Sequence, residues 1–348
     1  MATTSIREVA RHAGVSLGTV SNVLNRPESV SASTRARVEG SIRELGFVRN
    51  ESARTLRAGR SRTVGLVVLD VANPFFTDVA RGAEDVAEEN GMVVTLCNSS
   101  ESAARETRHL DHLEEQRVQG VLITPVEGAN SRLERLVERG IPVVLVDRGS
   151  GAPNRCSVAV DDVKGGRTAV AHLLDRGHRR IAFVGGPSGI QQVRDRYAGA
   201  ESAVKSCGAQ RSSRPPVLEL METPSLTLRA GMEAGAHIAS ISPSRRPTAV
   251  FCANDLLALG LLQEAMHQGL HVPDDVAIVG YDDIDFAAAA VVPLSSVRQP
   301  RDQLGRAAAE LLFDEISAGE SHRHRQILFE PELIVRRSSD ELASGPTP

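Results

Sequence analysis

The chain has 348 residues, so it can form two or three domains with sizeable cores and needs neither a disulfide nor a structural metal to fold. Hydrophobic residues make up 41% of it, but no stretch approaches the ~20 apolar residues of a membrane span, so we expect no membrane association. The net charge of -4 argues by itself against binding to nucleic acid, but residues 1–60 hold ten Arg, no Lys and five Glu, and the remainder is acidic. This distribution predicts a basic head that contacts phosphates, joined to an acidic body.

The amino-terminal region and the cysteines indicate the compartment. The first thirty residues contain no continuous apolar segment and no small-residue cleavage site, so we expect no secretory signal and a cytoplasmic location. The four cysteines lie far apart and form no CxxC pair. We interpret them as reduced residues in or near the core. They are Cys97, Cys156, Cys207 and Cys252.

The head begins with two short predicted helices. Ser5 and Glu8 form a capping-box pattern that starts the first helix, and Gly14 can adopt positive φ after its end. Ser16 can cap a second helix that runs to about residue 24. Two short helices joined by a tight turn with glycine are typical of a helix-turn-helix motif, whose second helix enters the major groove. We expect four of its residues to face base edges: Leu17, Gly18, Ser21 and Asn22.

A third predicted helix begins at Ser31 and ends at Gly46, with its apolar residues in register. Three arginines, Arg35, Arg37 and Arg43, lie outside that apolar stripe. They are either solvated surface or phosphate contacts, and the sequence leaves both interpretations open. A plain pair of helices inside a larger core is the alternative to the helix-turn-helix, and the basic surplus of the head favours the helix-turn-helix.

The segment of residues 50–57 follows the third helix and could form only about two turns of helix, with Asn50 as a cap. An isolated helix shorter than about 12 residues is marginal in water, so we expect this segment to fold only against a partner or DNA. It is therefore a candidate switch between the head and the body.

The head resembles the headpiece of the lactose repressor family of bacterial transcriptional regulators. The matching segments are residues 6–25, 30–31 with 34–35, 46–47 and 50–56. The resemblance implies that paired hinge helices enter the minor groove at the operator centre and that Leu56 wedges between base pairs. A place for Leu56 in the core of a linker is the alternative. The motif and the resemblance together imply these DNA-binding residues: Ser16, Leu17, Gly18, Thr19, Ser21, Asn22, Asn25, Ser31, Thr34, Asn50, Ala53, Arg54 and Leu56.

Three residues of the head depart from the pattern of that family. Arg49 stands where a proline usually precedes the hinge asparagine, which bears on the geometry of the hinge. Gly18 removes a side chain from a position that often reads a base, and Asn22 stands where several members carry arginine. The last two departures make the operator sequence of other members hard to transfer to this chain.

After residue 62 short apolar runs alternate with amphipathic stretches, which predicts doubly wound parallel sheets. The predicted strands are residues 64–69, 93–97, 121–123, 143–146, 181–184, 249–252 and 276–279. More than seven strands exceed one comfortable sheet, and the weakly structured stretch 149–155 lies near the midpoint. We therefore expect two similar lobes.

Ligands of open α/β sheets bind outside the carboxyl ends of the strands, so the residues that follow each strand are candidates for a pocket. Here these ends carry carboxylates, amides, arginine and aromatic rings, which suit sugars and nucleosides. Asn and Asp are also common as helix caps, and at Asn73 and Asp255 we expect a cap rather than a ligand contact.

The body continues the resemblance to the lactose repressor family, which reaches to about residue 337. Further matches are Asp161 with Gly165-Gly166, residues 172–181 and residues 297–300. The resemblance implies three crossovers between the lobes and dimerisation through the body. It implies an effector site made of Phe75, Phe76, Asp147, Arg148, Arg196, Asn254 and Asp282.

Rival functions have weaker support. The glycine-rich residues 185–189 lack the G-x-G-x-x-G spacing, so a nucleotide-dependent enzyme is disfavoured. We expect no catalytic site, no cofactor and no metal, and interpret the pairs His109 with His112 and His322 with His324 as ordinary surface residues. A periplasmic solute receptor without a DNA role is the stronger alternative, and the head disfavours it.

The sequence thus predicts a small all-α helix-turn-helix headpiece with a hinge helix, followed by a two-lobe α/β body like that of periplasmic binding proteins. We expect a DNA-binding repressor, a homodimer or tetramer on a pseudo-palindromic operator, controlled by a small polar effector such as a sugar or nucleoside. The expected boundaries are 1–48 for the head, 49–61 for the hinge and 62–340 for the body, followed by a disordered tail at 341–348. Within the body, the first lobe takes 62–161 with 292–322, and the second takes 162–291 with 323–340.

Overall fold

The computed structural model describes residues 4–48, 61–127, 130–149, 151, 154–208 and 215–340. The chain divides into two compact units, Met1–Ser61 and Arg62–Pro348, which we call the head and the body and describe separately. The predicted hinge contacts Asn50, Ala53, Arg54 and Leu56 lie outside the described residues, as does the tail at 341–348. Their roles stay predictions.

The head contains the helices that the sequence predicts. They are α1 Ile6–Ala13, α2 Leu17–Asn25 and α3 Ala32–Glu44, with the short 3-10 helix η1 Pro27–Ser29 between the last two. The capping box forms as expected, because the Ser5 hydroxyl accepts from the Glu8 amide and the Glu8 carboxylate accepts from the Ser5 amide. Gly14 ends α1 in the left-handed region at φ 61°. A small core holds the helices together and consists of Val9, Ala10, Ala13, Val20, Val23 and Val38.

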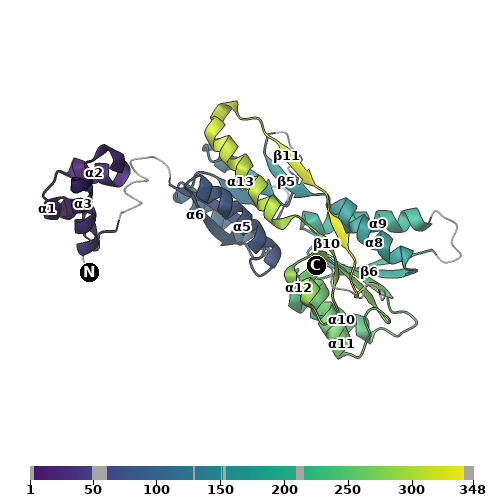
Figure 1. The fold of residues 1–348 in the computed structure, drawn as a ribbon. Coiled ribbons are helices and arrows are strands. Elements are labelled where there is room, and N and C mark those ends of the chain that lie inside the picture. The colour runs from purple at the N-terminus through teal and green to yellow at the C-terminus, as the bar shows by residue number, and fades with distance from the viewer. Residues whose placement is uncertain are drawn as a thin grey trace. The chain divides into compact units, whose positions relative to one another are not determined.

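The body contains two six-stranded sheets, each covered by helices (Figure 1). The first has the order β11-β5-β4-β3-β1-β2, with β1 Thr63–Val68, β2 Val93–Asn98, β3 Val121–Ile123, β4 Val143–Val146, β5 Ser157–Val160 and β11 Gln326–Phe329. Together with the helices α5 Pro74–Glu89, α6 Ala103–Glu115, α7 Ser131–Glu138 and α13 Arg301–Ala318, it forms what we call the first lobe.

The second sheet has the order β12-β10-β9-β8-β6-β7, with β6 Arg180–Gly185, β7 Val217–Glu222, β8 Ala249–Cys252, β9 Ala277–Asp282, β10 Ser295–Arg298 and β12 Glu332–Ile334. The second lobe adds the helices α8 Asp162–Asp175, α9 Gln191–Gly208, α10 Leu228–Ser240, α11 Asp255–His267 and α12 Asp285–Ala289. Among the described strand pairs, all are parallel except β10 with β12. The two lobes with parallel sheets were predicted.

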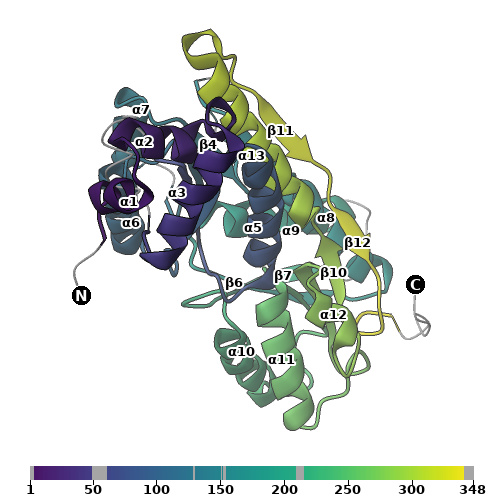
Figure 2. The ribbon, with the colours of Figure 1, turned by 60° about the vertical axis from the view of Figure 1, so that its left-hand side comes forward.

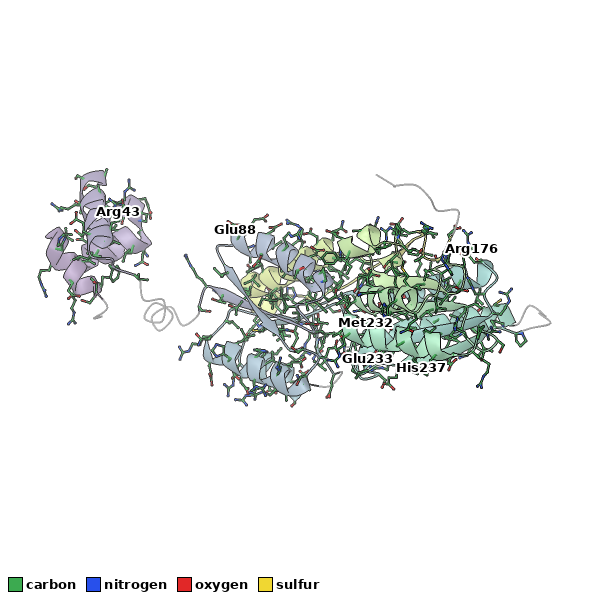
Figure 3. The ribbon with its side chains drawn as sticks, turned by 90° about the horizontal axis from the view of Figure 1, so that it is seen from below. Arg43, Glu88, Arg176, Met232, Glu233 and His237 are labelled. Carbon is green, nitrogen blue, oxygen red and sulfur yellow. The ribbon has the colours of Figure 1, made fainter. Side chains whose placement is uncertain are left out.

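Successive side chains of a strand point to opposite faces of the sheet, and in the first sheet both faces carry apolar side chains. Leu66 and Leu122 belong to the core under α5 and α13, whereas their neighbours Val67 and Val121 belong to the core under α6 and α7. Figure 2 shows α5 beside α13, and α10 beside α11 on the second lobe. Side chains on the solvent face of the helices are charged or polar, as with Glu88 on α5 and Glu233 and His237 on α10 (Figure 3).

The chain crosses between the lobes three times: from β5 to α8, from β10 to α13 and from β11 to β12. Two of the boundaries predicted for the lobes are wrong. The prediction placed β10 in the first lobe and β11 in the second, whereas β10 pairs with β9 of the second sheet and β11 pairs with β5 of the first. Both strands have only four residues and mix polar with apolar side chains, so neither forms the apolar run on which strand prediction depends.

Two further properties of the body bear on the predictions. The four cysteines are unbridged, and all except Cys207 are buried. No helix in the described part of the chain combines the length and the apolar character that a membrane crossing requires.

Candidate nucleic-acid interface and ligand cleft

An open groove on the head collects five of the predicted DNA contacts. Its lining consists of Val15, Ser16, Thr19, Asn22, Ser29, Val30, Ser31, Thr34 and Arg37. The groove lies where α2 and α3 begin, because Ser16 caps α2 and Ser31 caps α3. Free amide hydrogens at the first turn of a helix favour a negative charge, so this groove suits a phosphate group of a DNA backbone.

The two capping serines already use their hydroxyl oxygens. Ser16 Oγ accepts from the Thr19 amide at 3.1 Å and lies 2.9 Å from Thr19 Oγ1. Ser31 Oγ accepts from the Thr34 amide at 3.4 Å and donates to Thr34 Oγ1 at 3.0 Å. These four side chains therefore fix the helix starts, and each hydroxyl keeps further hydrogen-bonding capacity for a phosphate.

The first turns of α2 present the predicted base-reading residues. Leu17 is 44% exposed although it is apolar, and Gly18 and Asn22 are exposed as well. Asn25 instead donates to the backbone oxygen of Ser21 at 2.8 Å and to its hydroxyl at 3.2 Å. Leu17 and Asn22 are exposed on the same helix, and an apolar side chain with an amide side chain fits contact with a thymine methyl group and a base edge.

The arginines of α3 differ in position. Arg37 lines the groove, whereas Arg35 and Arg43 do not, and Arg43 lies near the other end of α3 (Figure 3). Within residues 4–48 none of the three forms an ion pair. Of the two interpretations left open by the sequence, the position of Arg37 favours phosphate contact for that residue.

The body has a cleft between the carboxyl ends of the strands of its two sheets. It encloses about 410 Å³, including the part open to solvent, and is lined by Leu69, Asp70, Asn73, Phe75, Phe76, Glu101, Asp147, Ile190, Gln192, Arg196, Leu226, Asn254 and Asp282. Six of the seven predicted effector residues are among them. Arg148 is not, and the charged groups that act on it are Arg194, Asp195 and Glu106.

Arg196 of α9 is held rigidly at the back of the cleft. Its Nε donates to Asp162 at 2.8 Å, its Nη1 donates to the backbone oxygen of Ala253 at 2.6 Å, and its guanidinium lies 3.7 Å from the centre of the Tyr281 ring. Burial alone would lower the pKa of Arg196, but the charge of Asp162 and of the other acidic groups outweighs it and raises the pKa. Arg196 is therefore a fixed positive charge.

A glycine makes this position of Arg196 possible. A Cβ on Gly166 of α8 would lie 2.0 Å from the backbone oxygen of Arg196, so only glycine lets α8 and α9 approach this closely. The Gly165-Gly166 pair of the sequence thus serves helix packing directly behind the cleft.

Asp147 follows β4 and is held by a residue of the other lobe. Gln192 Nε2 donates to the Asp147 backbone oxygen at 2.6 Å and to its carboxylate at 3.1 Å. Burial raises the pKa of Asp147 well above its usual range, and the nearby charge of Asp162 adds to the effect. Two acceptors at this contact, Asp147 Oδ1 and Gln192 Oε1, are buried and receive no hydrogen bond from the part of the chain that the structure describes.

Asp282 ends β9 and also connects the lobes. Its carboxylate accepts from Asn73 of the first lobe at 3.0 Å and from Gln299 at 2.8 Å. Burial raises the pKa of Asp282, while Arg196 opposes the rise. Both Asp282 and Asp147 have positive φ, 105° and 56°, a backbone conformation that is uncommon for residues other than glycine.

The capping predictions were half right. Asn73 caps α5, because its Oδ1 accepts from the Phe75 amide at 3.1 Å, and its amide group remains free to reach Asp282. Asp255 is not a cap, because Asn254 caps α11. The side-chain amide of Asn254 also donates to the backbone oxygen of Leu226. Asp255 is the first residue of the helix instead, and its carboxylate accepts from the Ile284 amide and the Ser296 hydroxyl.

Three polar residues of the cleft, Asp70, Glu101 and Gln192, were not predicted, whereas Asn73 was a pocket candidate for which we favoured a helix cap alone. Glu101 accepts from the amide of Leu226 in the other lobe at 3.2 Å, and burial raises the pKa of Glu101 to about 7. Glu101 could have been predicted, because it lies just after the carboxyl end of β2 and ligands of open α/β sheets bind outside the carboxyl ends of the strands. Gln192 had no signal, because it is the second residue of α9 and does not directly follow a strand.

Comparisons with known proteins agree with this arrangement. The family described as "Bacterial regulatory proteins, lacI family" matches residues 5–50, and the "Periplasmic binding protein-like domain" matches residues 170–339. The "HTH-type transcriptional repressor PurR" of Aliivibrio fischeri strain MJ11 is 33% identical over 336 residues, which cover 96% of this chain and 98% of the relative.

Two further relatives span nearly the whole chain. The "Ribose operon repressor" of Escherichia coli strain K12 is 33% identical over 337 residues, which cover 96% of this chain and 99% of the relative. The crystal structure of the lac repressor dimer bound to operator and the anti-inducer ONPF aligns with a TM-score of 0.79 at 26% identity, covering 97% of this chain and 99% of the other.

Proposed function

The chain belongs to the lacI family of bacterial regulatory proteins, and we propose that it is a repressor whose hold on its operator depends on a neutral, hydroxyl-rich sugar bound between the lobes. Membership of the family makes it a DNA-binding transcriptional regulator. The effector, its effect on DNA binding and the assembly are the proposed parts. We further propose that the chain acts in the cytoplasm, on the DNA itself, and that it is a regulator without catalytic activity.

The observation that carries the proposed ligand is the pair of unsatisfied acceptors in the cleft. Asp147 Oδ1 and Gln192 Oε1 are buried without a donor among the described residues, and leaving such a group unpaired costs about 1–3 kcal/mol each. Neighbouring hydroxyl groups of a sugar donate to both. A ligand with adjacent hydroxyls therefore removes this cost when it binds.

The charge of the lining argues for a neutral ligand. Among the described residues, the cleft is lined by four acidic residues, Asp70, Glu101, Asp147 and Asp282, and one cation, Arg196. Burial raises the pKa of three of these acids, which lessens their negative charge. Arg196 is already paired with Asp162, so little positive charge remains for an anion. A phosphorylated sugar is disfavoured for this reason. That a relative is named the ribose operon repressor supports a pentose as the first ligand to test.

A nucleoside is the second candidate, favoured by one observation. Phe75 and Phe76, in the first turn of α5, form an edge-to-face pair with ring centres 4.9 Å apart. An aromatic ring can cover the apolar face of a sugar or stack on a base. The ligand screen below separates the two classes.

Closure of the cleft gives the ligand a way to act on the rest of the protein. Three hydrogen-bonded residue pairs join the lobes across the cleft: Asn73 with Asp282, Gln192 with Asp147 and Leu226 with Glu101. A ligand that shares these groups changes the angle between the lobes. We propose that this angle controls whether residues 50–57 fold on DNA.

The hinge roles of Asn50, Ala53, Arg54 and Leu56 are part of this proposal and rest on the family resemblance. If Leu56 is a wedge, Leu56→Ala weakens binding to the operator far more than binding to unrelated DNA. Equal losses on both kinds of DNA would remove that role from Leu56.

We propose that the chain binds a pseudo-palindromic operator as a homodimer, because two heads related by a twofold axis present α2 to two half-sites. The operator-bound lac repressor to which it is similar is a dimer. Sedimentation of the full chain with and without operator distinguishes a dimer from a tetramer. A solute receptor without a DNA role is disfavoured, because such a protein would not need the helix-turn-helix head.

A thermal-shift screen of the full chain against pentoses, hexoses and nucleosides tests the proposed ligand, since a ligand that binds only the folded state raises the melting temperature. The matched variants are Asp282→Asn in the cleft and Asp274→Asn on the exposed surface. We expect a sugar to raise the melting temperature of the wild type and of Asp274→Asn, but not of Asp282→Asn. A response to nucleosides alone, or an equal response of Asp282→Asn, would contradict the proposal.

The screen uses Asp282→Asn rather than a change at Arg196 for a physical reason. Removal of Arg196 leaves Asp162 buried without its partner, and loss of one member of a buried pair costs about 3–5 kcal/mol. Such a variant could lose its ligand response through unfolding. The asparagine at position 282 keeps the size of the side chain and an acceptor oxygen.

A further inference from the structure

Four side chains of types that bind metals meet at the amino ends of β5 and β11, far from the cleft along the sheet. Cys156 directly precedes β5, Glu315 lies in the last turns of α13, and His322 and His324 lie between the 3-10 helix η2 Gly319–Ser321 and β11. Figure 1 shows α13, β5 and β11 side by side at this end of the first lobe. One possible ligand atom from each of the four lies within 4.8 Å of the other three.

The distances fit the edges of a metal tetrahedron. Cys156 Sγ lies 3.1 Å from His322 Nε2 and 3.8 Å from His324 Nδ1. Glu315 Oε2 lies 3.9 Å from the same nitrogen of His322 and 3.7 Å from that of His324. Zinc bonds of ~2.0 Å to nitrogen or oxygen and ~2.3 Å to sulfur imply ligand separations of about 3.3–3.6 Å.

One carboxylate oxygen of Glu315 has no hydrogen-bond donor among the described residues, although buried carboxylates are normally hydrogen-bonded. Glu315 Oε2 is buried and accepts no hydrogen bond from the described residues, and its separations from the two imidazoles are too long for one. The side chain of Glu315 is 14% exposed, that of His322 is 7% exposed and Cys156 is fully buried. An unpartnered oxygen that faces two imidazoles and a thiol is what a bound cation would satisfy.

Charge and surroundings also suit a divalent ion. A thiolate and a carboxylate together neutralise two positive charges, so the loaded site is neutral. Cys156, Glu315 and His322 lie mostly inside the protein, whereas the side chain of His324 is 29% exposed. The backbone amide of Arg325 lies 3.3 Å from Cys156 Sγ and donates to it, as amides next to metal-bound thiolates do. The thiol proton passes to solvent when the metal binds.

We propose that Cys156, Glu315, His322 and His324 form a structural zinc site. Sulfur, two imidazoles and one carboxylate complete a four-coordinate set without an open position, which indicates a structural rather than a catalytic ion. No local sequence pattern indicated this site, because Cys156 lies far from the two histidines in the chain, and we interpreted His322 and His324 as ordinary surface residues. The ion joins the end of α13 to the edge strand β11, from which the chain makes its last crossover between the lobes.

Cobalt titration of the full chain after treatment with a chelator tests the site. We expect one cobalt ion per chain, a charge-transfer band from thiolate to cobalt and the intense visible bands of a tetrahedral ion. Zinc should then displace the cobalt and abolish these bands, because zinc loses no d-electron stabilisation in a tetrahedral site. Absence of a thiolate band, or only weak bands typical of a six-coordinate ion, would overturn the proposal.

Variants with matched controls assign the ligands. Cys156→Ser should abolish the charge-transfer band, whereas Cys207→Ser, at a half-buried cysteine of α9, should keep it. Glu315→Gln and His322→Gln should weaken zinc binding by more than the ~10–100-fold that loss of an outer partner costs. His112→Gln, at an exposed histidine of α6, should leave zinc binding unchanged.

A melting curve of each metal-free variant separates loss of the site from loss of the fold. We expect Cys156→Ser to melt near the temperature of the metal-free wild type but to gain nothing from zinc, while zinc raises the melting temperature of the wild type. A thiolate band that persists in Cys156→Ser, or equal zinc affinities of Glu315→Gln and the wild type, would contradict the assignment.

Discussion

The amide group of Asn73 donates a 3.0 Å hydrogen bond to the carboxylate of Asp282, and this bond joins the two lobes at the floor of the cleft. The same asparagine caps α5 with its other side-chain atom. One residue thus couples the start of a helix in the first lobe to the end of β9 in the second. A ligand that replaces either partner changes how the lobes meet.

Asn73→Asp tests this coupling. The aspartate keeps an oxygen that can cap α5, but it replaces the donor to Asp282 with a second carboxylate. We expect the affinity for the sugar found in the thermal-shift screen to fall by about tenfold or more, since a like charge in a buried site disfavours closure. Isothermal titration measures the change. Asn90→Asp at the other end of α5 is the control, and equal affinities of Asn73→Asp and the wild type would contradict the coupling.

The raised pKa of Glu101 predicts that the free energy of unfolding depends on pH. Burial raises its pKa from 4.5 to about 7, so between these values the folded chain keeps a proton that the unfolded chain releases. The contribution of Glu101 to stability is therefore present at low pH and is lost as the pH rises through about 7. We expect the free energy of unfolding of Glu101→Gln to fall less than that of the wild type between about pH 5 and pH 8, by on the order of 1 kcal/mol.

Denaturant unfolding of both proteins across this range measures the difference. Other buried carboxyl groups, such as Asp147 and Asp282, have raised pKa values too, so only the difference between the two proteins reports on Glu101. Identical pH profiles for the wild type and Glu101→Gln would show that burial does not raise the pKa of this group.

Gly166→Ala tests the packing behind Arg196. The new Cβ would lie 2.0 Å from the backbone oxygen of Arg196 and must push α8 and α9 apart. We expect a loss of about 1–3 kcal/mol in the free energy of unfolding and weaker sugar binding, because Arg196 shifts with its helix. Gly189→Ala is the control, since nothing lies within 4 Å of its Cβ. Similar losses in both variants would contradict this account.

Gly18→Ser tests how the head reads DNA. A Cβ at this position would meet only Ser16 Oγ, at 3.6 Å, so the fold of the head should tolerate it. We expect an unchanged melting temperature but a changed order of preference among operator variants, because a new side chain enters the major groove. Selection of binding sites from a random DNA pool measures this. The same selected sequences for both proteins would show that residue 18 does not face a base.

The sequence predicted the parts of the fold that have strong local signals. The strands at 121–123, 143–146 and 249–252 have the predicted bounds because each is a short, fully buried apolar run. The strands β10 and β11 lacked such a run, since they pair at the margins of their sheets with mixed side chains, and the lobes were therefore divided at the wrong residues.

The cleft residues at the carboxyl ends of strands were predictable from the sequence, and those within helices were less so. Asp147 follows β4 directly and Asp282 is the last residue of β9, so the topology of the sheets brings them together. Gln192 lies within a helix, and only the tertiary structure places it against Asp147. The same holds for Cys156 and His322, because contacts between residues so far apart in the chain leave no local pattern.

The most direct test of the central claim measures operator affinity of the full chain with and without the sugar found by thermal shift. Operator DNA comes from selection with the wild type, and fluorescence anisotropy at one fixed salt concentration gives the dissociation constant. The account predicts that a saturating amount of sugar changes this constant by ~5–150-fold in the wild type and leaves Asp282→Asn unchanged. An operator affinity of the wild type that is the same with and without the bound sugar would contradict it.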